Sequence, residues 1–134
     1  MDYKSVMGLL MTGKTDTIQK LKNKIRVFVS ERDWEQFHTP KNLSMSISIE
    51  AAELMEHFQW SNTFEEAVKI LKDKQKRSDI EDEVADIAIY LFGFCNLYGV
   101  DLEKVILKKI KKNEKKYPAK VVKGKMEKYT FYTR

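Results

Sequence analysis

Two pairs of acidic residues have types and spacings that could do chemistry. Glu50 and Glu53 are three residues apart, and so are Glu83 and Asp86. Residues three apart project from the same side of an α-helix, about one turn apart. Apolar residues flank both pairs, which favours helices that contribute to a core. If these two helices pack antiparallel, all four carboxylates lie close together.

Four neighbouring carboxylates need a cation beside them. Unpaired, they would repel one another and lose hydration, and both effects raise carboxyl pKa values. Oxygen-only ligands suit hard cations, so the expected ion is Mg²⁺, with Mn²⁺ as an alternative. Because Mg²⁺ usually completes its shell with water and substrate phosphates, the pattern favours binding of a metal-bound polyphosphate. The alternative is that these acids are solvated or paired with some of the many lysines.

A di-iron carboxylate site is disfavoured by the histidines. Such sites use a Glu-x-x-His pair on each of two helices. Here His57 follows Glu53 by four residues, and the segment around Glu83 contains no histidine. The acid pairs therefore indicate an oxygen-ligated divalent cation.

The composition favours an all-α fold. The chain has 134 residues, enough for a single domain over 1–134, with 43% hydrophobic residues, five glycines and two prolines. The expected architecture is an antiparallel helical bundle of about four main helices. The apolar periodicity and capping signals predict helices over about 16–31, 43–59, 63–71, 78–98 and 102–116. We expect a mobile lead-in over 1–14 and a mobile basic tail over 118–134.

The predicted helix over 78–98 is apolar on nearly every side, which is typical of a helix buried all round. In so short a chain this predicts a subunit interface, hence a homo-oligomer, either dimer or tetramer. Cys95 is the single cysteine and can form no internal disulfide. With no signal-peptide pattern and no apolar run long enough to span a bilayer, we expect a cytoplasmic protein without a membrane partner.

Charge is distributed unevenly. The net charge is +5, yet residues 101–134 contain twelve Lys/Arg and four Asp/Glu. A basic segment of this kind favours a nucleic-acid surface, a site for phosphates, or simply a solvated helix face. A basic helical nucleic-acid-binding module therefore stays open as an alternative function, although we regard a nucleic-acid partner as the weaker hypothesis.

Taken together, the motifs resemble those of the MazG-like all-α nucleotide pyrophosphohydrolases, and the dCTP pyrophosphatase branch in particular. The E-x-x-E and E-x-x-D pairs match the family signature, as does the segment RDWEQFHTPKN at 32–42. Lys109, Asn113 and Tyr117 match a K-x-x-x-N-x-x-x-Y-P pattern. The resemblance covers roughly Ile18 to Tyr129. Ser48 and Ala51 replace a smaller, glycine-containing run that is common in this branch, which bears on substrate choice.

The resemblance implies a Mg²⁺-dependent hydrolase that cuts a nucleoside triphosphate between its α and β phosphates. The products would be a nucleoside monophosphate and pyrophosphate, and the role would be house-cleaning of dCTP-like or modified nucleotides. Glu50, Glu53, Glu83 and Asp86 would be the catalytic metal ligands, one of which would orient or deprotonate the attacking water. A catalytically silent nucleotide sensor is the remaining alternative.

Lys109 and Asn113, four residues apart on one helix face, would meet the phosphates together with Tyr117. Tyr117 could instead be a packing residue beside Pro118.

The base would lie among aromatic residues, on which it can stack. The expected contacts are Trp34, Phe37, His38, Asn42 and Trp60. Two alternatives stay open, a core role for Trp34 and Phe37 and a capping role for Asn42.

Overall fold

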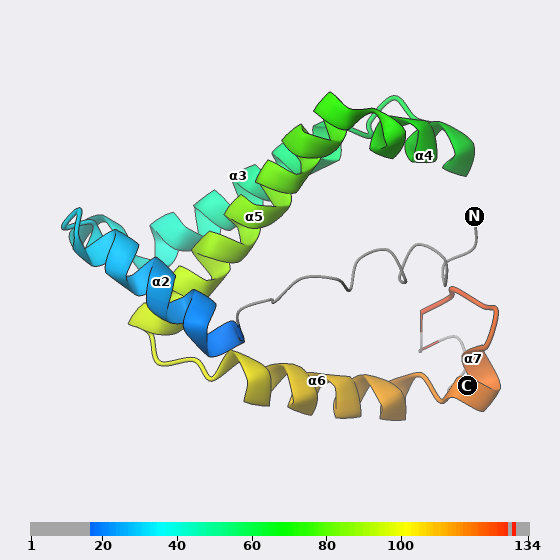
Figure 1. Cartoon of the computed structure of the whole chain (residues 1–134). Helices are drawn as coiled ribbons and strands as arrows, with labels where there is room; N and C mark the ends of the chain where they lie inside the picture. Colours follow the sequence, from blue (N-terminus) through cyan, green and yellow to red (C-terminus); the bar gives the residue numbers. More distant parts are fainter. Residues whose placement is uncertain (1–16, 129, 131–134) are drawn as a thin grey trace.

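The structure, a computed structural model, describes residues 17–128 and 130 (Figure 1). Within these residues every regular element is a helix, which confirms the predicted all-α class. The expected lead-in over 1–14 lies outside the described residues, as do Tyr129 and residues 131–134 of the basic tail.

Six α-helices and one 3₁₀ turn follow one another along the described chain. They are α2 (Ile18–Ser30), η1 (Glu35–Phe37), α3 (Pro40–Glu56), α4 (Phe64–Lys72), α5 (Lys74–Leu97), α6 (Leu102–Lys116) and α7 (Ala119–Val122). The short helix α7 lies in the tail, where the sequence shows no clear period.

Two helices begin earlier than the sequence indicated. The α3 helix starts at Pro40 because the Thr39 hydroxyl accepts a hydrogen bond from the backbone N–H of Asn42 (3.1 Å), and proline is well suited to the first helical turn. The predicted helix start at residue 78 is wrong, although Ser78 and Glu81 have the S-x-x-E spacing of a capping box. Asp73 caps α5 instead, and its carboxylate accepts from the N–H of Lys76 at 2.9 Å.

The other helix starts lie close to their predicted positions. Thr17 caps α2, close to the predicted helix start at about residue 16. Thr63 and Glu66 form a reciprocal capping box at α4, and Asp101 caps α6 as predicted.

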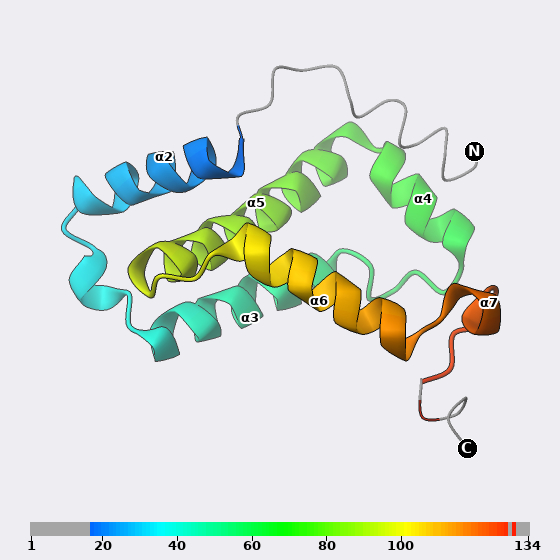
Figure 2. The ribbon, with the colours of Figure 1, turned by 90° about the horizontal axis from the view of Figure 1, so that it is seen from below.

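The centre of the fold is an antiparallel pair, α3 and α5, seen side by side in Figures 1 and 2. Helix α2 also packs on α5, and α4 joins the other end of α5. Leu43 of α3 is almost fully buried, with Val29 of α2 and Ile80 and Cys95 of α5 among the other buried apolar side chains. Tight packing of these side chains fixes the axial position of α3 against α5.

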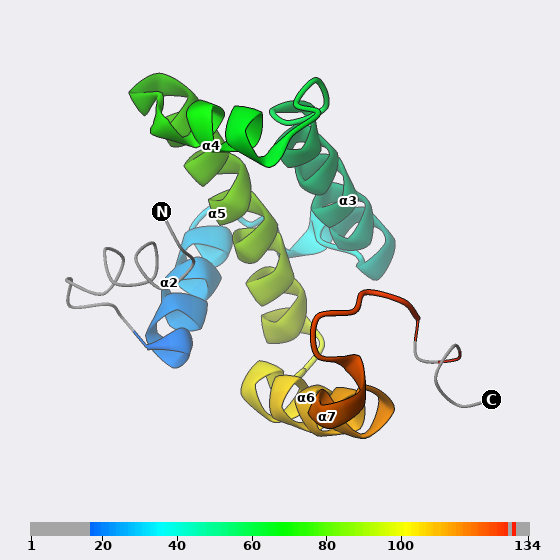
Figure 3. The same ribbon diagram turned by 90° about the vertical axis from the view of Figure 1, so that its right-hand side faces the viewer.

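Helix α6 departs from the expected bundle. Gly99, with a φ of 65°, lies in the connection just after the end of α5. Helix α6 then runs at an angle of 107° to α5. Figures 1 and 3 show α6 and α7 set apart from the α3–α5 pair. Leu102 anchors the start of α6 by being buried, but α6 is not one of the helices that pack extensively on α5.

Among the described residues, no single helix is both long and apolar enough to cross a membrane, although the bent pair α5 and α6 together would meet those two criteria.

Candidate functional site

Antiparallel packing of α3 on α5 brings three acids together. Carboxylate oxygens of Glu50, Glu83 and Asp86 all lie within 4.8 Å of one another. All three residues are half-buried. The cluster is therefore made by two segments that are more than thirty residues apart in the chain.

Glu53, the fourth predicted acid, is exposed and is not part of this three-oxygen cluster. It nevertheless affects the cluster electrostatically. The pKa of Glu50 is raised above its usual value of 4.5, first because of burial and next because of the negative charge of Glu53. Asp86 and Glu83 raise it further, and a side-chain hydrogen bond with Glu83 acts in the same direction. Without a cation, the cluster therefore makes ionisation of Glu50 less favourable than that of an isolated carboxyl group.

The cluster fits a hard divalent cation. It offers three carboxylate groups from two rigid helices, and their oxygens are close enough together to share one ion. A cation would also offset the repulsion that raises the pKa of Glu50. In that case Glu50, Glu83 and Asp86 would hold it, with Glu53 beside them.

A pocket of about 320 Å³ adjoins the acid cluster. Its wall is mainly apolar and aromatic, a composition typical of small-molecule sites. The lining residues are Ile25, Phe28, Val29, Trp34, His38, Leu43, Asp86, Ile89, Tyr90 and Gly93. Asp86 belongs to both the acid cluster and the pocket wall, so the two features form one continuous site.

Two aromatic side chains, Phe28 of α2 and Trp34 of the following loop, form one rim of the pocket, and Arg32 packs against them. The rings of Phe28 and Trp34 pack edge to face, with centroids 5.7 Å apart and planes at 78°. The guanidinium carbon of Arg32 lies 3.7 Å from the Phe28 ring centroid, and its Nη1 donates to the Phe28 carbonyl at 2.9 Å. This cation–π contact and hydrogen bond hold Phe28, which in turn supports Trp34.

His38 faces the pocket from the loop before α3. Its Nδ1 atom is buried and has no hydrogen-bond partner within the described part of the chain. The backbone of this loop is well fixed, because the Tyr98 hydroxyl donates to the His38 carbonyl and the Asn42 side chain donates to the Phe37 carbonyl, both at 2.9 Å. A buried ring nitrogen in a fixed loop is a group ready to bond a ligand.

Three predicted base contacts do not line this pocket. Asn42 donates its side-chain amide to the Phe37 carbonyl and so holds the loop, but Thr39, not Asn42, caps α3, so the capping alternative for Asn42 is wrong. The Phe37 side chain is 60% exposed and Trp60 is 84% exposed. Trp34 precedes α3 and Trp60 follows it, and a helix of 17 residues is about 25 Å long, so one chain does not bring both tryptophans to the same base.

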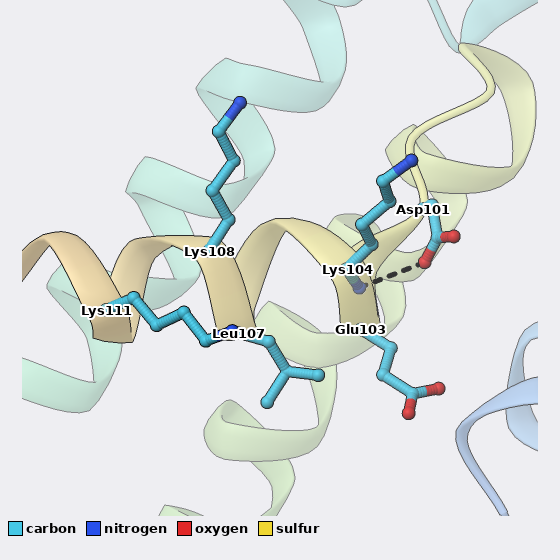
Figure 4. Close-up of a pocket in the computed structure, with 6 residues that line it drawn as sticks. All are labelled: Asp101, Glu103, Lys104, Leu107, Lys108 and Lys111. Carbon is cyan, nitrogen blue, oxygen red and sulfur yellow. Dashed lines mark hydrogen bonds between the residues drawn. The ribbon is translucent and has the colours of Figure 1, made fainter.

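The predicted phosphate contacts lie on α6, away from the acid cluster. Lys109 and Asn113 are exposed and share one helix face, as their spacing requires, and Tyr117 caps the end of the helix. A groove of about 440 Å³ also lies along α6, lined by Asp101, Glu103, Lys104, Leu107, Lys108 and Lys111 (Figure 4).

The lining side chains of this groove diverge. In Figure 4, Lys104 and Lys108 extend away from Glu103 and Leu107. The Asp101 carboxylate is engaged in capping, accepting from the N–H of Lys104 at 3.0 Å. The groove therefore has no convergent polar groups that would indicate a ligand site.

Seven of the ten lining residues were not predicted as site residues, and three of these seven, Phe28, Tyr90 and Gly93, are informative. A signal existed for two of them. Tyr90 lies one turn after Asp86 and places a hydroxyl-bearing ring on the same helix face. Gly93 interrupts a helix interior, where glycine is unfavourable without a local reason. Phe28 gave no signal, because its spacing is that of an ordinary core residue.

Comparisons with known proteins identify the family of the chain. The MazG-like family matches residues 45–130, which include both acid pairs. The chain is 34% identical to dCTP pyrophosphatase 1 of Rattus norvegicus and of Homo sapiens over 114 residues, or 85% of this chain. The match spans 66% of each of these relatives, just under two thirds of their length.

A solved structure shares the fold. A pyrophosphatase from Archaeoglobus fulgidus is 37% identical and superposes with a TM-score of 0.72, covering 81% of this chain and 98% of that one. The family match, the sequence identity and the shared fold all lead to one conclusion: the chain belongs to the MazG-like family.

Proposed function

We propose that this protein hydrolyses a nucleoside triphosphate between the α and β phosphates, releasing a nucleoside monophosphate and pyrophosphate. The preferred substrate would be dCTP or a modified deoxynucleotide, in keeping with a house-cleaning role in the cytoplasm. One observation carries the proposal: Asp86 lies both in the acid cluster and in the wall of the aromatic pocket. A base in the pocket would therefore place its triphosphate beside the acids.

The pocket suits a nucleobase. Trp34 and Tyr90 offer ring faces, and Leu43 and Ile89 supply the apolar contacts that a flat heterocycle favours. His38 adds a single buried polar atom that can bond the base edge or a sugar hydroxyl. The printed names of the relatives, dCTP pyrophosphatase 1, support cytosine as the first base to test.

The acids would divide two tasks between them. Mg²⁺, or Mn²⁺ in its place, would neutralise the polyphosphate charge and lower the pKa of a bound water. Glu50, Glu83 and Asp86 would hold the ion. One of the four acids would orient the attacking water or accept its proton, and Glu53 suits that task because it lies beside the cluster and is exposed.

The same proposal includes a homo-oligomer. Val84 on α5 and Ile106, Leu107 and Ile110 on α6 are each between 43% and 54% exposed. Exposed apolar side chains on both helices favour contact with another subunit. A two-fold related copy would cover them, as a dimer or as half of a tetramer.

An oligomer would also account for the predicted contacts that one chain leaves apart. Lys109 and Asn113 on α6 are separate from the acid cluster, and so is Tyr117 at its end. In a two-fold assembly, α6 of one copy can lie across the acid cluster of the other, and each copy serves its partner equally. Trp60, and Phe37 in the same way, could reach the pocket of another copy.

A panel of ribo- and deoxyribonucleoside triphosphates tests the proposed reaction. Each is incubated with Mg²⁺ or with EDTA, and pyrophosphate is measured without added pyrophosphatase. We expect EDTA-sensitive pyrophosphate release from one or a few nucleotides, with dCTP among them. If no nucleotide yields pyrophosphate although the protein is folded, the hydrolase assignment is wrong and the nucleotide-sensor alternative gains support.

The position of the cut needs its own measurement. In water labelled with ¹⁸O, attack at the α phosphate places the label in the monophosphate, whereas attack at the β phosphate places it in pyrophosphate. We expect label in the monophosphate alone. Label in the pyrophosphate would contradict the proposed attack at the α phosphate.

A further inference from the structure

We infer that Gly93 sets the size of the base that the pocket accepts. The inference rests on the proposed use of this pocket for a nucleobase, and goes beyond it by naming the residue that limits substituents on the base. Gly93 lies in the interior of α5, is buried, and lines the aromatic pocket.

Nothing in the backbone or in the packing requires glycine at this position. Gly93 is not one of the positive-φ glycines of the described chain, which are Gly99 and Gly124. A Cβ atom built on Gly93 would meet no atom within 4 Å apart from its chain neighbours and the surrounding backbone of its own helix. Glycine is unfavourable in a helix interior compared with alanine, and the usual reasons for it, a special φ or a close neighbour, are both missing here. The absence of a side chain therefore leaves open space.

That space joins two hollows. Beside the pocket of about 320 Å³ lies a small void of about 20 Å³, enough for one water molecule. The two share four lining residues, Ile25, Val29, His38 and Gly93. Because Gly93 lies where they adjoin, a side chain there would fill the inner end of the pocket.

A polar atom lies in the same wall. His38 also lines both hollows, and its buried Nδ1 has no partner within the described residues. Asn96, which lines the small void, already uses its amide to donate to the Lys22 carbonyl at 2.8 Å. The inner end therefore offers empty volume beside the buried His38 nitrogen, with the charged Arg26 and Glu35 also on the wall of the small hollow, so a base edge can place a polar atom next to His38 and a substituent in the free volume.

The position along α5 fits this assignment. Gly93 follows Asp86 by seven residues, or about 10 Å along the helix axis. A nucleotide whose phosphates lie near Asp86 would extend its base toward Gly93. The group on the far edge of the base, such as a substituent at C5 of a pyrimidine, would occupy the room that glycine leaves.

Equilibrium binding of nucleoside monophosphates tests the inference without depending on turnover. The ligands are dCMP, 5-methyl-dCMP, 5-iodo-dCMP and dAMP, each titrated with Mg²⁺ by calorimetry. The proteins are wild type, Gly93→Ala and Gly93→Val. Ser78→Ala serves as a matched control, because it also places alanine in α5 but at an exposed position outside the pocket.

We expect the variants to lose affinity in order of ligand size. Gly93→Ala should weaken 5-iodo-dCMP about tenfold or more relative to dCMP, since one methyl group in a close-fitting pocket changes discrimination by that order. Gly93→Val should extend the loss to 5-methyl-dCMP, and Ser78→Ala should change neither ratio. Gly93→Ala should also raise Tm, because alanine favours the helix, so a folding failure does not explain its loss. If Gly93→Val does not fold, the alanine variant alone decides.

Three results would overturn the inference. They are an unchanged selectivity in Gly93→Ala, an equal loss for all ligands, and no binding of any of the nucleotides to wild type. A different pattern separates the two proposals. If wild type binds the ligands and Gly93→Ala shows the size-dependent loss, yet no triphosphate is hydrolysed, the hydrolase assignment fails and the role of Gly93 stands.

Discussion

Glu50 on α3 and Asp86 on α5 place carboxylate oxygens within 4.8 Å of each other, and Glu83 lies within the same distance of both. This relationship depends on the antiparallel packing of two helices around Leu43, which is 1% exposed. Because Asp86 also lines the aromatic pocket, the acids and the pocket act as one site. Four features of the site can each be tested by experiment: the electrostatics of the acids, metal binding, the aromatic rim of the pocket and the contribution of Lys109 from a second chain.

The acid cluster should make the metal-free protein less stable as pH rises. The pKa of Glu50 is raised above 4.5 in the fold, so between 4.5 and its raised value the native state holds more proton than the unfolded state. The free energy of unfolding therefore falls as pH increases through that window. Glu50→Gln should reduce this fall, and in EDTA it should have a higher Tm than wild type at pH 7. The check is Tm against pH for both proteins, and identical profiles would contradict the account.

Mg²⁺ should stabilise the protein through the same acids. A cation that binds only the native state at about 100 times its Kd adds about 2.7 kcal/mol, which corresponds to several degrees in Tm. Asp86→Asn should lose most of this shift. Asp82→Asn, which changes an exposed acid on the same helix outside the cluster, should keep it. Differential scanning calorimetry with and without Mg²⁺ decides, and equal shifts in the two variants would exclude Asp86 as a ligand.

The sequence identified the helices that carry the acid pairs, but it did not show which of the predicted site residues lie together in one chain. The acid pairs were recognisable because residues three apart share a helix face, and the helix that carries each pair was correctly identified. The departure of α6 was not predictable, since Gly99 signals only that α5 ends and gives no direction for the next helix. Trp60 was grouped with Trp34 by residue type, yet they lie on either side of α3, and only the packed structure shows this separation.

The aromatic rim should matter more for binding than the exposed aromatic residues of a single chain. Trp34→Ala should weaken nucleotide binding by about 1–3 kcal/mol, or roughly 5- to 150-fold, because a base loses a stacking partner. Phe37 is 60% exposed and does not line the pocket, so Phe37→Ala should have a smaller effect on binding. Calorimetric Kd values for dCMP provide the comparison, and an equal or larger loss for Phe37→Ala would contradict the leading role of Trp34 in stacking.

Lys109 should act on the site of a neighbouring chain. Lys109→Ala and Asp86→Asn should each be nearly inactive alone, whereas a mixed oligomer has some sites with both groups intact. Mixing and reassembling the two variants should therefore restore up to about a quarter of the activity in a two-site dimer with random pairing. Refolding each variant alone is the control. No recovery, with mixed oligomers demonstrated by mass spectrometry, would show that Lys109 serves its own chain or does not contribute.

The most direct test of the central claim is the rate of pyrophosphate release from dCTP by wild type, Asp86→Asn and Asp82→Asn, each with Mg²⁺ and with EDTA. We predict turnover by wild type and by Asp82→Asn that EDTA abolishes, and a loss of at least about a hundredfold for Asp86→Asn, with helical circular dichroism unchanged in all three. Full activity of Asp86→Asn, or turnover that persists in EDTA, would contradict a metal-dependent reaction at the Glu50, Glu83 and Asp86 cluster.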